Sequence, residues 1–479
     1  MSALIFIFGP ILLAALVGWM GRKDGAWVRY VALALFTLLL AYALWLLRHV
    51  PHGGYLSLGE FLNVPAFKFA LTLQVDTLSA IMLLLTATLL LLVGLSSWTI
   101  DRPGPYFALL ILFSGPIVGV FATTSLLWFF IFWELTLVPM VFLVGIWGAE
   151  RRIYAAVKFF LYTHFASMLI LLAFFLIYAQ SGVFDMTQLK ESMLLTPALV
   201  WWLLFIGFAV KMPIFPFHTW LPDAHVQAPA PVSVLLAGVL LKMGAYAMIR
   251  MAMLMMPEQA HRHAWVVLTL GLITLFYAGF MAIYETHLKK MVAYSSISHM
   301  GLVTVAIATL GFGGLSAALF EMIGHALIIS PLFLIAGFLH HRTGSWQMGD
   351  MGGLMQKAPW LSAVFVLAGL AALGLPGTAG FIGELSILIA SIHRFGLWMA
   401  VVAIASMVGA GYIIWTFRRV IYGEISRAVE TNDFSMNRVE FAALVIFSVL
   451  ILWFGLFPSQ LFSIINGAFD ALHATGGAL

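Results

Sequence analysis

The sequence predicts an all-α protein that crosses a membrane many times. Of its 479 residues, 63% are hydrophobic and 9% are charged, whereas about a quarter of the residues of a typical globular domain carry a charge. The mean hydropathy is +1.06. Apolar runs long enough to cross a hydrocarbon core of ~30 Å recur along the whole chain, so almost no sequence remains for a soluble domain.

The apolar runs predict about fourteen transmembrane helices. The first run is followed by no small-residue cleavage site and polar mature segment, so we expect it to be a retained span and not a signal peptide. The runs cover roughly residues 3–20, 29–47, 77–98, 106–121, 123–147, 155–179, 197–220, 230–255, 264–284, 290–310, 314–341, 360–392, 398–420 and 438–466.

The basic residues predict the orientation of the chain. If the N-terminus is outside, the inner loops hold Arg22, Lys23, Arg29, Arg102, Arg151, Arg152, Lys158, Lys289, Lys290, Arg342, Lys357, Arg418, Arg419, Arg427 and Arg438. The outer loops then hold Arg48, Lys68, Lys190, Arg250, Arg262 and Arg394. This excess on the inner side is the positive-inside bias. It places both termini on the outer side of the membrane, and it explains the net charge of +4 without a nucleic-acid partner.

Several classes of site are excluded by what the sequence lacks. The chain contains no cysteine, which rules out disulfides, zinc thiolates and iron–sulfur ligation by this chain. It has no phosphate-binding loop, no dinucleotide-binding glycine motif and no H-E-x-x-H motif. We therefore expect neither a metal site nor a cofactor in this chain.

Titratable residues lie inside the predicted spans. A charge in lipid costs several kcal/mol unless it is paired or hydrated, so these residues must face the protein interior or a water-filled cavity. A structural ion pair would explain any one of them, and for His164 and Glu321 that explanation is as good as a functional one. Four such residues on four different helices favour a route for protons or ions: Glu134, Lys211, Lys242 and Glu384, accompanied by His299 and His325.

Two of the predicted spans are broken by proline. Pro213 and Pro216 follow Lys211 and cannot donate the backbone hydrogen bonds of a helix. The span at 360–392 is too long for one straight helix, and Pro376 interrupts it before Glu384. Lipid does not satisfy the carbonyls that such breaks leave free, so both stretches are expected to border a polar cavity.

The two broken spans are five spans apart, which predicts an internal repeat. A repeat of five helices enters the membrane in the opposite sense the second time, as in many secondary transporters. The predicted organisation is three N-terminal spans at 1–105, a first repeat at 106–260, an inverted second repeat at 261–425 and a last span within 426–479.

Four segments resemble the antiporter-like, proton-translocating subunits of respiratory complex I: "FWELTLVPMVFLVGIWG", "FAVKMPIFPFHTWLPDAHVQAPAPVSVLLAGVLLKMGAY", "KKMVAYSSISHMG" and "LGLPGTAGFIGELSIL". The resemblance runs from about residue 75 to about residue 425. It implies that Glu134 and Lys211 form an ion pair and that Lys242 is the central relay lysine. It also implies that His299 and His325 continue the polar route. The family has three related branches, and two of them usually have lysine at the position of Glu384. The glutamate here therefore implies that the chain belongs to the third branch.

The resemblance also implies a function and a set of partners. Electron transfer from NADH to quinone would drive proton translocation, and NADH, FMN, iron–sulfur clusters and quinone would all be bound by partner subunits. This chain would be a non-catalytic pumping subunit that contacts other membrane subunits, including two sister antiporter-like chains.

Other assemblies use subunits of nearly the same pattern. A multisubunit sodium/proton antiporter would transport ions without a redox partner, and a membrane-bound hydrogenase or a ferredoxin-driven complex I would use another electron source. A purely structural scaffold is disfavoured, because a scaffold has no need of charged residues beside broken helices.

Overall fold

A computed structural model describes residues 2–21, 25–51, 54–64, 69–189 and 197–474 of the chain. Four basic residues that contribute to the predicted orientation lie outside these ranges: Arg22, Lys23, Lys68 and Lys190. The chain divides into two compact units. Unit 1 comprises Met1–Lys211, Met243–His263 and Ile464–Leu479, and unit 2 comprises Met212–Lys242 and Ala264–Ser463.

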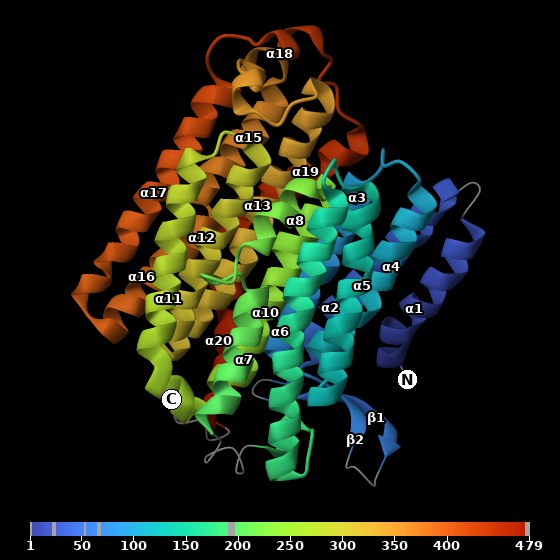
Figure 1. Ribbon diagram of the computed structural model, residues 1–479, viewed down its shortest axis with the longest axis vertical. Helices are drawn as coiled ribbons and strands as arrows, with labels where there is room; N and C mark the ends of the chain where they lie inside the picture. Colours follow the sequence, from blue (N-terminus) through green and yellow to red (C-terminus); the bar gives the residue numbers. More distant parts are fainter. Residues whose placement is uncertain (1, 22–24, 52–53, 65–68, 190–196, 475–479) are drawn as a thin grey trace. The chain divides into compact units, whose positions relative to one another are not determined.

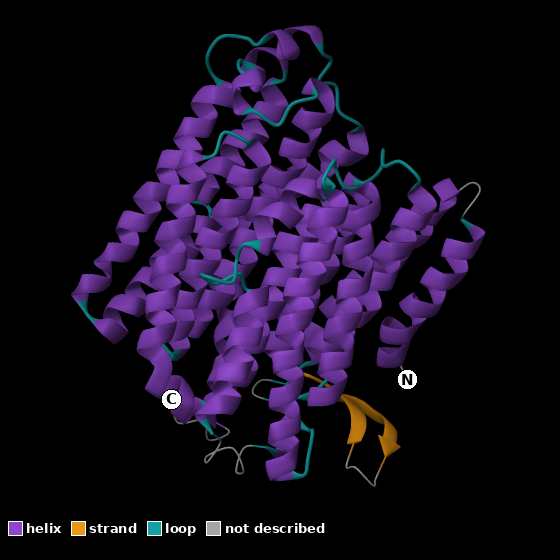
Figure 2. Cartoon of the chain, viewed as in Figure 1, coloured by secondary structure: helices purple, strands orange, loops and turns teal. Residues whose placement is uncertain are grey.

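Unit 1 contains the N-terminal helices and a β-hairpin (Figures 1 and 2). Its elements are α1 (Ser2–Met20), η1 (Gly25–Trp27), α2 (Val28–His49), β1 (Leu56–Val64), β2 (Phe69–Val75), α3 (Thr77–Ser96), α4 (Pro103–Ala122), α5 (Leu126–Trp147), α6 (Arg152–Ser181), η3 (Met186–Gln188), α7 (Ala198–Lys211) and η6 (Met248–Leu254). Helices that follow one another in sequence pack together: α4 contacts α3 and α5, and α6 contacts α5 and α7.

The apolar runs did not predict the β-hairpin of unit 1. β1 and β2 pair antiparallel, with Leu56 opposite Val75 and Phe61 opposite Leu71. Along β2 every second residue is buried, the period that a strand with one covered face requires. The hairpin lies at the end of unit 1 where α1 begins (Figure 1).

Unit 2 is organised around one long helix. Its elements are α8 (Trp220–Gln227), α9 (Ala230–Leu235), η5 (Leu236–Leu240), α12 (Leu288–Ala308), α13 (Phe312–Thr343), η7 (Met348–Met351), α14 (Leu354–Lys357), α15 (Pro359–Ala372), α16 (Ala379–Phe395), η8 (Leu397–Ala400), α17 (Val401–Thr416), η9 (Phe417–Ile421), α18 (Arg427–Thr431) and α19 (Arg438–Leu456). α13 contacts α9, α12, α15, α16 and α19. It is buried over most of its length, as expected of a helix surrounded by others, and it ends at Gly344, whose φ of +71° is typical of a helix terminus.

Three helices contribute residues to both units: α10 (Leu241–Ala247), α11 (Pro257–Tyr284) and α20 (Pro458–Ala474). Among the described residues, twelve helices are long and apolar enough to cross a membrane, and thirteen if one bent pair is counted as a span. The prediction of an all-α polytopic membrane protein is confirmed. The lower count has a physical reason: the spans predicted at 197–220 and 360–392 are broken, and their longest helical segments have 14 and 17 residues.

Candidate functional site

Glu134, near the middle of α5, is paired with a histidine. Nδ1 of His164, on α6, donates a hydrogen bond of 2.8 Å to Oε2 of Glu134. The side chains of His164 and Glu134 are 43% and 22% exposed, and Oε1 of Glu134 has no hydrogen-bond partner among the described residues. The pair therefore lies near a surface, and Oε1 of Glu134 remains available to accept a hydrogen bond from another donor.

Lys211 is the last residue of α7 and is almost completely buried. Its Nζ lies 5.2 Å from the ring centre of Trp133 and 6.0 Å from that of Phe159. Aromatic faces attract a cation by about 0.5–2 kcal/mol, so the two rings stabilise the ammonium group. The ion pair with Glu134 that the resemblance implies is not among the ion pairs of the described residues. Glu134 is bound to His164 instead.

The chain leaves helical geometry directly after Lys211. Residues 212–219 separate α7 from α8 and contain both Pro213 and Pro216. Within this segment the N–H of Phe215 donates to Oγ1 of Thr274, on α11, over 2.9 Å. A backbone group outside the helical ladder is thus satisfied by a side chain, as the absence of water in a bilayer core requires.

Lys242 lies on α10, between the two π-helical segments η5 and η6. Such segments are rare and frequent at functional sites. Nζ of Lys242 donates to the carbonyl of Ala237 over 2.7 Å and to Nδ1 of His325 over 2.5 Å. Lys242 has no exposed surface, so these two acceptors replace the water that an ammonium group would otherwise bind.

His325 and His299 extend this contact through unit 2. Because Nδ1 of His325 accepts from Lys242, its proton lies on Nε2, which has no partner among the described residues. The ring centres of His325 and His299 are 5.1 Å apart. Nδ1 of His299 donates to Oε1 of Glu321 over 2.9 Å. Lys242, His325, His299 and Glu321 therefore form a buried row of neighbouring polar side chains, made of two hydrogen-bonded pairs whose imidazole rings lie next to each other. We call this row the unit 2 chain.

Glu384 lies on α16, beyond the break that contains Pro376. Its Oε2 accepts a hydrogen bond of 2.8 Å from Oγ of Ser406, on α17. Gly374, in the break, has a φ of +76°, and a Cβ there would lie 2.8 Å from Oε2 of Glu384. Glycine is needed at 374 both for this left-handed backbone and for the close approach of the carboxylate.

A small cavity lies between His299 and Glu384. About 20 Å³ is available to water, and the polar side chains around it are Ser298, His299, Glu384, Ser406 and Tyr412. A buried water needs about 10–15 Å³ and two to four polar partners. The cavity is therefore large enough and polar enough to hold one water molecule between the unit 2 chain and Glu384.

The prediction that Lys289 lies in an inner loop is wrong. Lys289 belongs to α12 and is fully buried. Its Nζ donates to the carbonyl of Ala228 and lies 5.1 Å from the ring centre of Trp346. Lys290, next to it, is partly exposed and pairs with Glu285 over 2.5 Å. Two adjacent lysines are typical of a loop, and only the helix geometry shows that one of them points inward.

The prediction that Arg250 lies in an outer loop is also wrong. Arg250 belongs to η6, inside an apolar span, and forms an ion pair with Asp76 in which the side chains are 11% and 15% exposed. Asp76 also caps α3 by accepting the N–H of Ser79 over 2.9 Å. Ser79 in turn is hydrogen-bonded to the hydroxyl of Tyr246 over 2.9 Å. Neither partner indicates the other in the sequence, because they are 174 residues apart.

His225, on α8, is a further buried group that the motifs did not single out. It has no exposed surface, and neither of its ring nitrogens has a hydrogen-bond partner among the described residues. Its ring stacks on Phe333 of α13 at 4.6 Å. Its position just after the broken span, in "LPDAHVQAP", is the signal that could have identified it.

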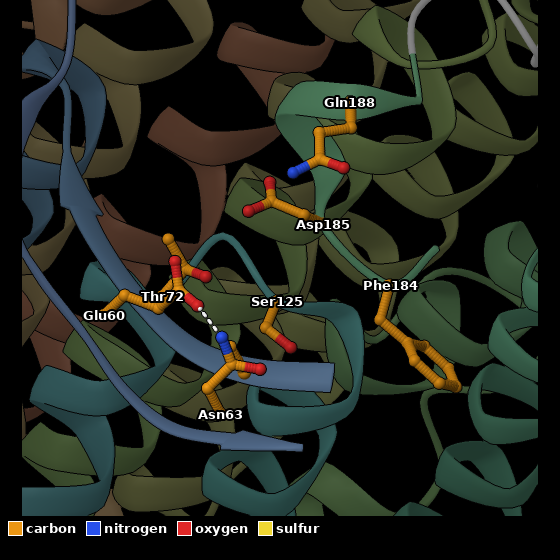
Figure 3. Close-up of a pocket in the computed structure, with 8 residues that line it drawn as sticks. Glu60, Asn63, Thr72, Ser125, Phe184, Asp185 and Gln188 are labelled. Atoms are coloured by element: carbon orange, nitrogen blue, oxygen red, sulfur yellow. Dashed lines mark hydrogen bonds between the residues drawn. The ribbon is translucent and has the colours of Figure 1, made fainter. Parts of the chain in front are cut away.

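A larger pocket, of about 330 Å³, lies at the hairpin of unit 1 (Figure 3). It is lined by Glu60 and Asn63 of β1, Thr72 of β2, Ser125, Phe184, Asp185 and Gln188. Both carboxylates are already engaged: Glu60 accepts from Asn63 over 2.7 Å, and Asp185 accepts from the N–H and hydroxyl of Thr187. No group of three or more His, Cys, Asp or Glu side chains in the described part of the chain is arranged to hold a metal ion.

The titratable residues from Glu134 to Glu384 all fall within the region that matches a known family. The family described as NADH:quinone oxidoreductase/Mrp antiporter, TM, matches residues 123–409. The chain belongs to this family. A relative from Rickettsia conorii, named NADH-quinone oxidoreductase subunit M, is 40% identical over 400 residues, which cover 82% of this chain and 81% of the relative. The predicted resemblance, including the branch indicated by Glu384, is confirmed.

Two solved structures share the fold over nearly the whole chain. A chain of respiratory complex I from Thermus thermophilus with bound NADH superposes with a TM-score of 0.86 at 25% identity, covering 98% of this chain and 99% of that one. A chain of the Mrp complex from Dietzia sp. DQ12-45-1b superposes with a TM-score of 0.90 at 21% identity, covering 99% and 98%. The second match shows the fold alone.

Proposed function

We propose that this chain is a proton-translocating membrane subunit of an NADH:quinone oxidoreductase of the complex I type. The family, the relatives named subunit M and the buried unit 2 chain support this function. NADH, FMN, iron–sulfur clusters and quinone would belong to partner subunits, and this chain would carry out no redox step. Its neighbours would be other membrane subunits, including two sister antiporter-like chains.

The observation that carries the proposal is the row of neighbouring titratable side chains in unit 2, from Lys242 through His325 and His299 to Glu321. A proton on Lys242 is directly hydrogen-bonded to Nδ1 of His325, and uptake there releases the proton on Nε2 toward His299. Glu321 holds the ring of His299 and stabilises its charged form. Proton transfer over one water is within the reach of general acid–base chemistry, so Glu384 would receive the proton across the small cavity.

In unit 1, Glu134 would control the charge of Lys211. While Glu134 is bound to His164, the contacts of the Lys211 ammonium group with the described residues are the faces of two aromatic rings. If Glu134 moves to Lys211, an opposite charge at ~4 Å is worth roughly 4 kcal/mol at an effective dielectric of 20, before screening. Exchange of Glu134 between two partners would thus change the affinity of Lys211 for its proton.

A substitution series at Glu384 tests the route. The intact complex is purified and placed in vesicles, and proton uptake is measured per electron transferred. Glu384→Gln keeps the size of the side chain but cannot titrate, and should lower coupled proton transport by roughly tenfold or more. Glu384→Lys restores a titratable group and should recover part of it. Glu258→Gln, at an exposed position that begins α11, is the matched control. Wild-type transport in Glu384→Gln would exclude Glu384 from the route.

We also propose a bacterial plasma membrane location with both termini outside. Because the chain lacks cysteine, single cysteines can be labelled selectively. Gly313 and Gly349 suit this test, since no atom lies within 4 Å of a Cβ at either position. Gly313→Cys should react with an impermeant reagent from outside, and Gly349→Cys only after permeabilisation. The opposite pattern would reverse the orientation.

The fold alone does not separate this function from that of an Mrp-type antiporter, because both assemblies superpose on the chain. The named relatives favour the oxidoreductase. Sodium-dependent proton transport by inverted vesicles without added NADH would favour the antiporter instead.

A further inference from the structure

We propose that the pocket at the hairpin of unit 1 binds a calcium ion, with Glu60 and Asp185 as carboxylate ligands and Ser125 as a hydroxyl ligand (Figure 3). The pocket offers about 330 Å³ to water, which is enough for an ion together with several of its waters. All of its lining residues belong to unit 1, and none of them belongs to the proposed proton route. Calcium binding here would thus be a property separate from transport.

Backbone hydrogen bonds hold distant segments of the chain around the pocket. β1 and β2 pair so that Glu60 lies opposite Thr72, which places the two side chains on the same face of the hairpin. β2 is also joined to the segment before α5, because the carbonyl of Thr72 accepts the N–H of Thr124 over 3.1 Å. In that segment Ser125 forms a β-bridge with Asp185. The ligands are therefore brought together by the main chain before any ion binds.

Ser125 is the observation that points to a ligand. It precedes α5 at the N-cap position, where a serine hydroxyl normally accepts an N–H from the first turn of the helix. Ser125 makes no such bond. The residue is only 2% exposed, and its hydroxyl has no hydrogen-bond partner among the described residues. An unsatisfied buried hydroxyl is costly, and an ion in the pocket would remove that cost.

Each carboxylate leaves one oxygen for an ion. Oε1 of Glu60 accepts from Nδ2 of Asn63 over 2.7 Å. Oδ1 of Asp185 accepts from the N–H and the hydroxyl of Thr187 over 2.8 and 2.7 Å. No described residue donates to Oε2 of Glu60 or to Oδ2 of Asp185. The described residues that line the pocket include no basic side chain, so a bound cation would supply the counter-charge.

The donor atoms favour calcium over other metals. Calcium takes six to eight oxygen ligands, among them carboxylates, amide oxygens and waters, in a flexible geometry. Asn63 and Gln188 add amide oxygens to the lining, and Thr72 adds a hydroxyl. The described lining contains no histidine and the chain no cysteine, so zinc and copper would lack their preferred ligands. No sequence motif marks such a site, because its ligands lie on segments far apart in the chain.

The small number of carboxylates predicts weak binding. Calcium affinity rises with the charge of the ligands, and weak sites of extracellular modules have dissociation constants of about 0.1–1 mM. Two carboxylates place the pocket in this range. The proposed orientation puts the hairpin on the outer side of the membrane, the side on which calcium sites of this affinity operate.

Hydrogen exchange of the intact, purified complex tests the site, with calcium chloride as the probe. Metal ions are first removed with a chelator, and exchange is compared in calcium chloride and in potassium chloride of the same ionic strength. At ten times the dissociation constant, calcium should slow the exchange of the peptides that contain Glu60 and Asp185 by roughly tenfold. The peptides of unit 2 should not change. Equal slowing in potassium chloride, or none in calcium chloride, would overturn the proposal.

Two charge variants and a matched control locate the response. Asp185→Asn keeps an oxygen that can accept from Thr187, and Glu60→Gln keeps the size of the side chain, but each removes one negative charge. Each should raise the dissociation constant for calcium by roughly tenfold, because ligand charge sets the affinity. Glu150→Gln removes an exposed charge outside the pocket and should respond like the wild type. A full response in either pocket variant would overturn the proposal.

Ser125→Ala separates a ligand from a helix cap. The variant should bind calcium more weakly than the wild type. Without calcium it should melt like the wild type, because no cap bond is lost, and so should Glu60→Gln. A wild-type calcium response in Ser125→Ala, or a lower melting temperature without calcium, would overturn the site. Exchange is measured without NADH or turnover, so its outcome is independent of the transport tests at Glu384.

Discussion

The buried charges of the two units differ in how they are partnered. In unit 1, Glu134 is bound to a half-exposed histidine, and Lys211 is held by the faces of two aromatic rings. In unit 2, Lys242 is hydrogen-bonded directly to His325, and the contacts continue to His299 and Glu321. Unit 1 thus separates its acid from its lysine, whereas unit 2 connects its titratable groups.

This difference indicates two tasks. A proton moves along groups that are within hydrogen-bond reach or joined by one water. The unit 2 chain comes nearer to that condition, because it contains two hydrogen-bonded pairs, Lys242 with His325 and His299 with Glu321, whose imidazole ring centres are 5.1 Å apart. A lysine whose carboxylate partner is free to move has two charge environments instead of one, which suits a switch. The predictions below test this division, beginning with the largest expected effect.

Removing Lys242 should abolish coupled transport. Lys242→Met keeps the length of the side chain but removes the donor to Nδ1 of His325 and to the carbonyl of Ala237. We expect proton transport by the intact complex to fall by roughly a hundredfold, the lower range for loss of a general acid–base group. Lys290→Met, which removes a lysine from a partly exposed ion pair, is the control. Normal transport in Lys242→Met would contradict the division between the units.

Unit 1 also contains a buried ion pair, Asp76 with Arg250, that lies outside the proposed route. Asp76→Asn leaves Arg250 without a counter-charge, and breaking a buried pair costs about 3–5 kcal/mol. The melting temperature of the complex should therefore fall, while protons per electron in the assembled complex stay unchanged. Glu60→Gln, in the hairpin, should alter neither quantity. If Asp76→Asn changed the number of protons transported per electron, the ion pair of unit 1 would belong to the proton route.

The sequence alone predicted those features that depend on the free-energy cost of single residues in lipid. A charge or a proline inside an apolar run is expensive in a bilayer. For this reason Lys211, Lys242 and Glu384 could be selected as candidates from the order of the residues alone. The same reasoning predicts that the membrane helices are interrupted, and α7 indeed ends at Lys211.

What could not be predicted depends on contacts between distant segments. The partner of Glu134 is on another helix, and nothing in the sequence ranks His164 above Lys211. Lys289 and Arg250 were misplaced because a loop and a helix end have the same composition, and only packing separates them. The small cavity beside Glu384 is invisible in the sequence, since the residues that line it come from helices far apart along the chain, α12 and α17 among them.

Replacing Glu134 should have an intermediate effect. Glu134→Gln removes the charge that would move between His164 and Lys211, so transport should fall by roughly fivefold, within the range of coupling free energies of 1–3 kcal/mol. Stability should change little, because partly exposed ion pairs contribute about 0–1 kcal/mol. Glu150→Gln, at an exposed position beyond α5, is the control. If Glu134→Ala and Lys211→Ala each transported protons at wild-type levels, the site in unit 1 would be structural only.

The smallest expected effect concerns His287, which lies outside both sites and precedes α12. Its ring accepts the N–H of Lys290 over 3.3 Å and stacks on Trp346. Burial, followed by the charge of Lys289, lowers the pKa of His287 from 6.5 to about 4. Between pH 6.5 and about pH 4 the unfolded segment therefore binds more protons than the folded segment. The stability of the folded segment should fall as the pH drops from about 6.5 to about 4. Above this window the group should contribute no pH dependence.

Hydrogen exchange of the peptide that contains His287, corrected for the intrinsic effect of pH, measures this local stability. The wild type should lose protection across the window, whereas His287→Asn, which keeps a good helix-capping side chain but does not titrate, should lose less. Coupled transport at neutral pH should be the same in both proteins, because His287 is neutral there and belongs to neither site. A profile in His287→Asn as steep as that of the wild type would assign the acid sensitivity to another group, and lower transport at neutral pH would extend the route of unit 2 to the start of α12.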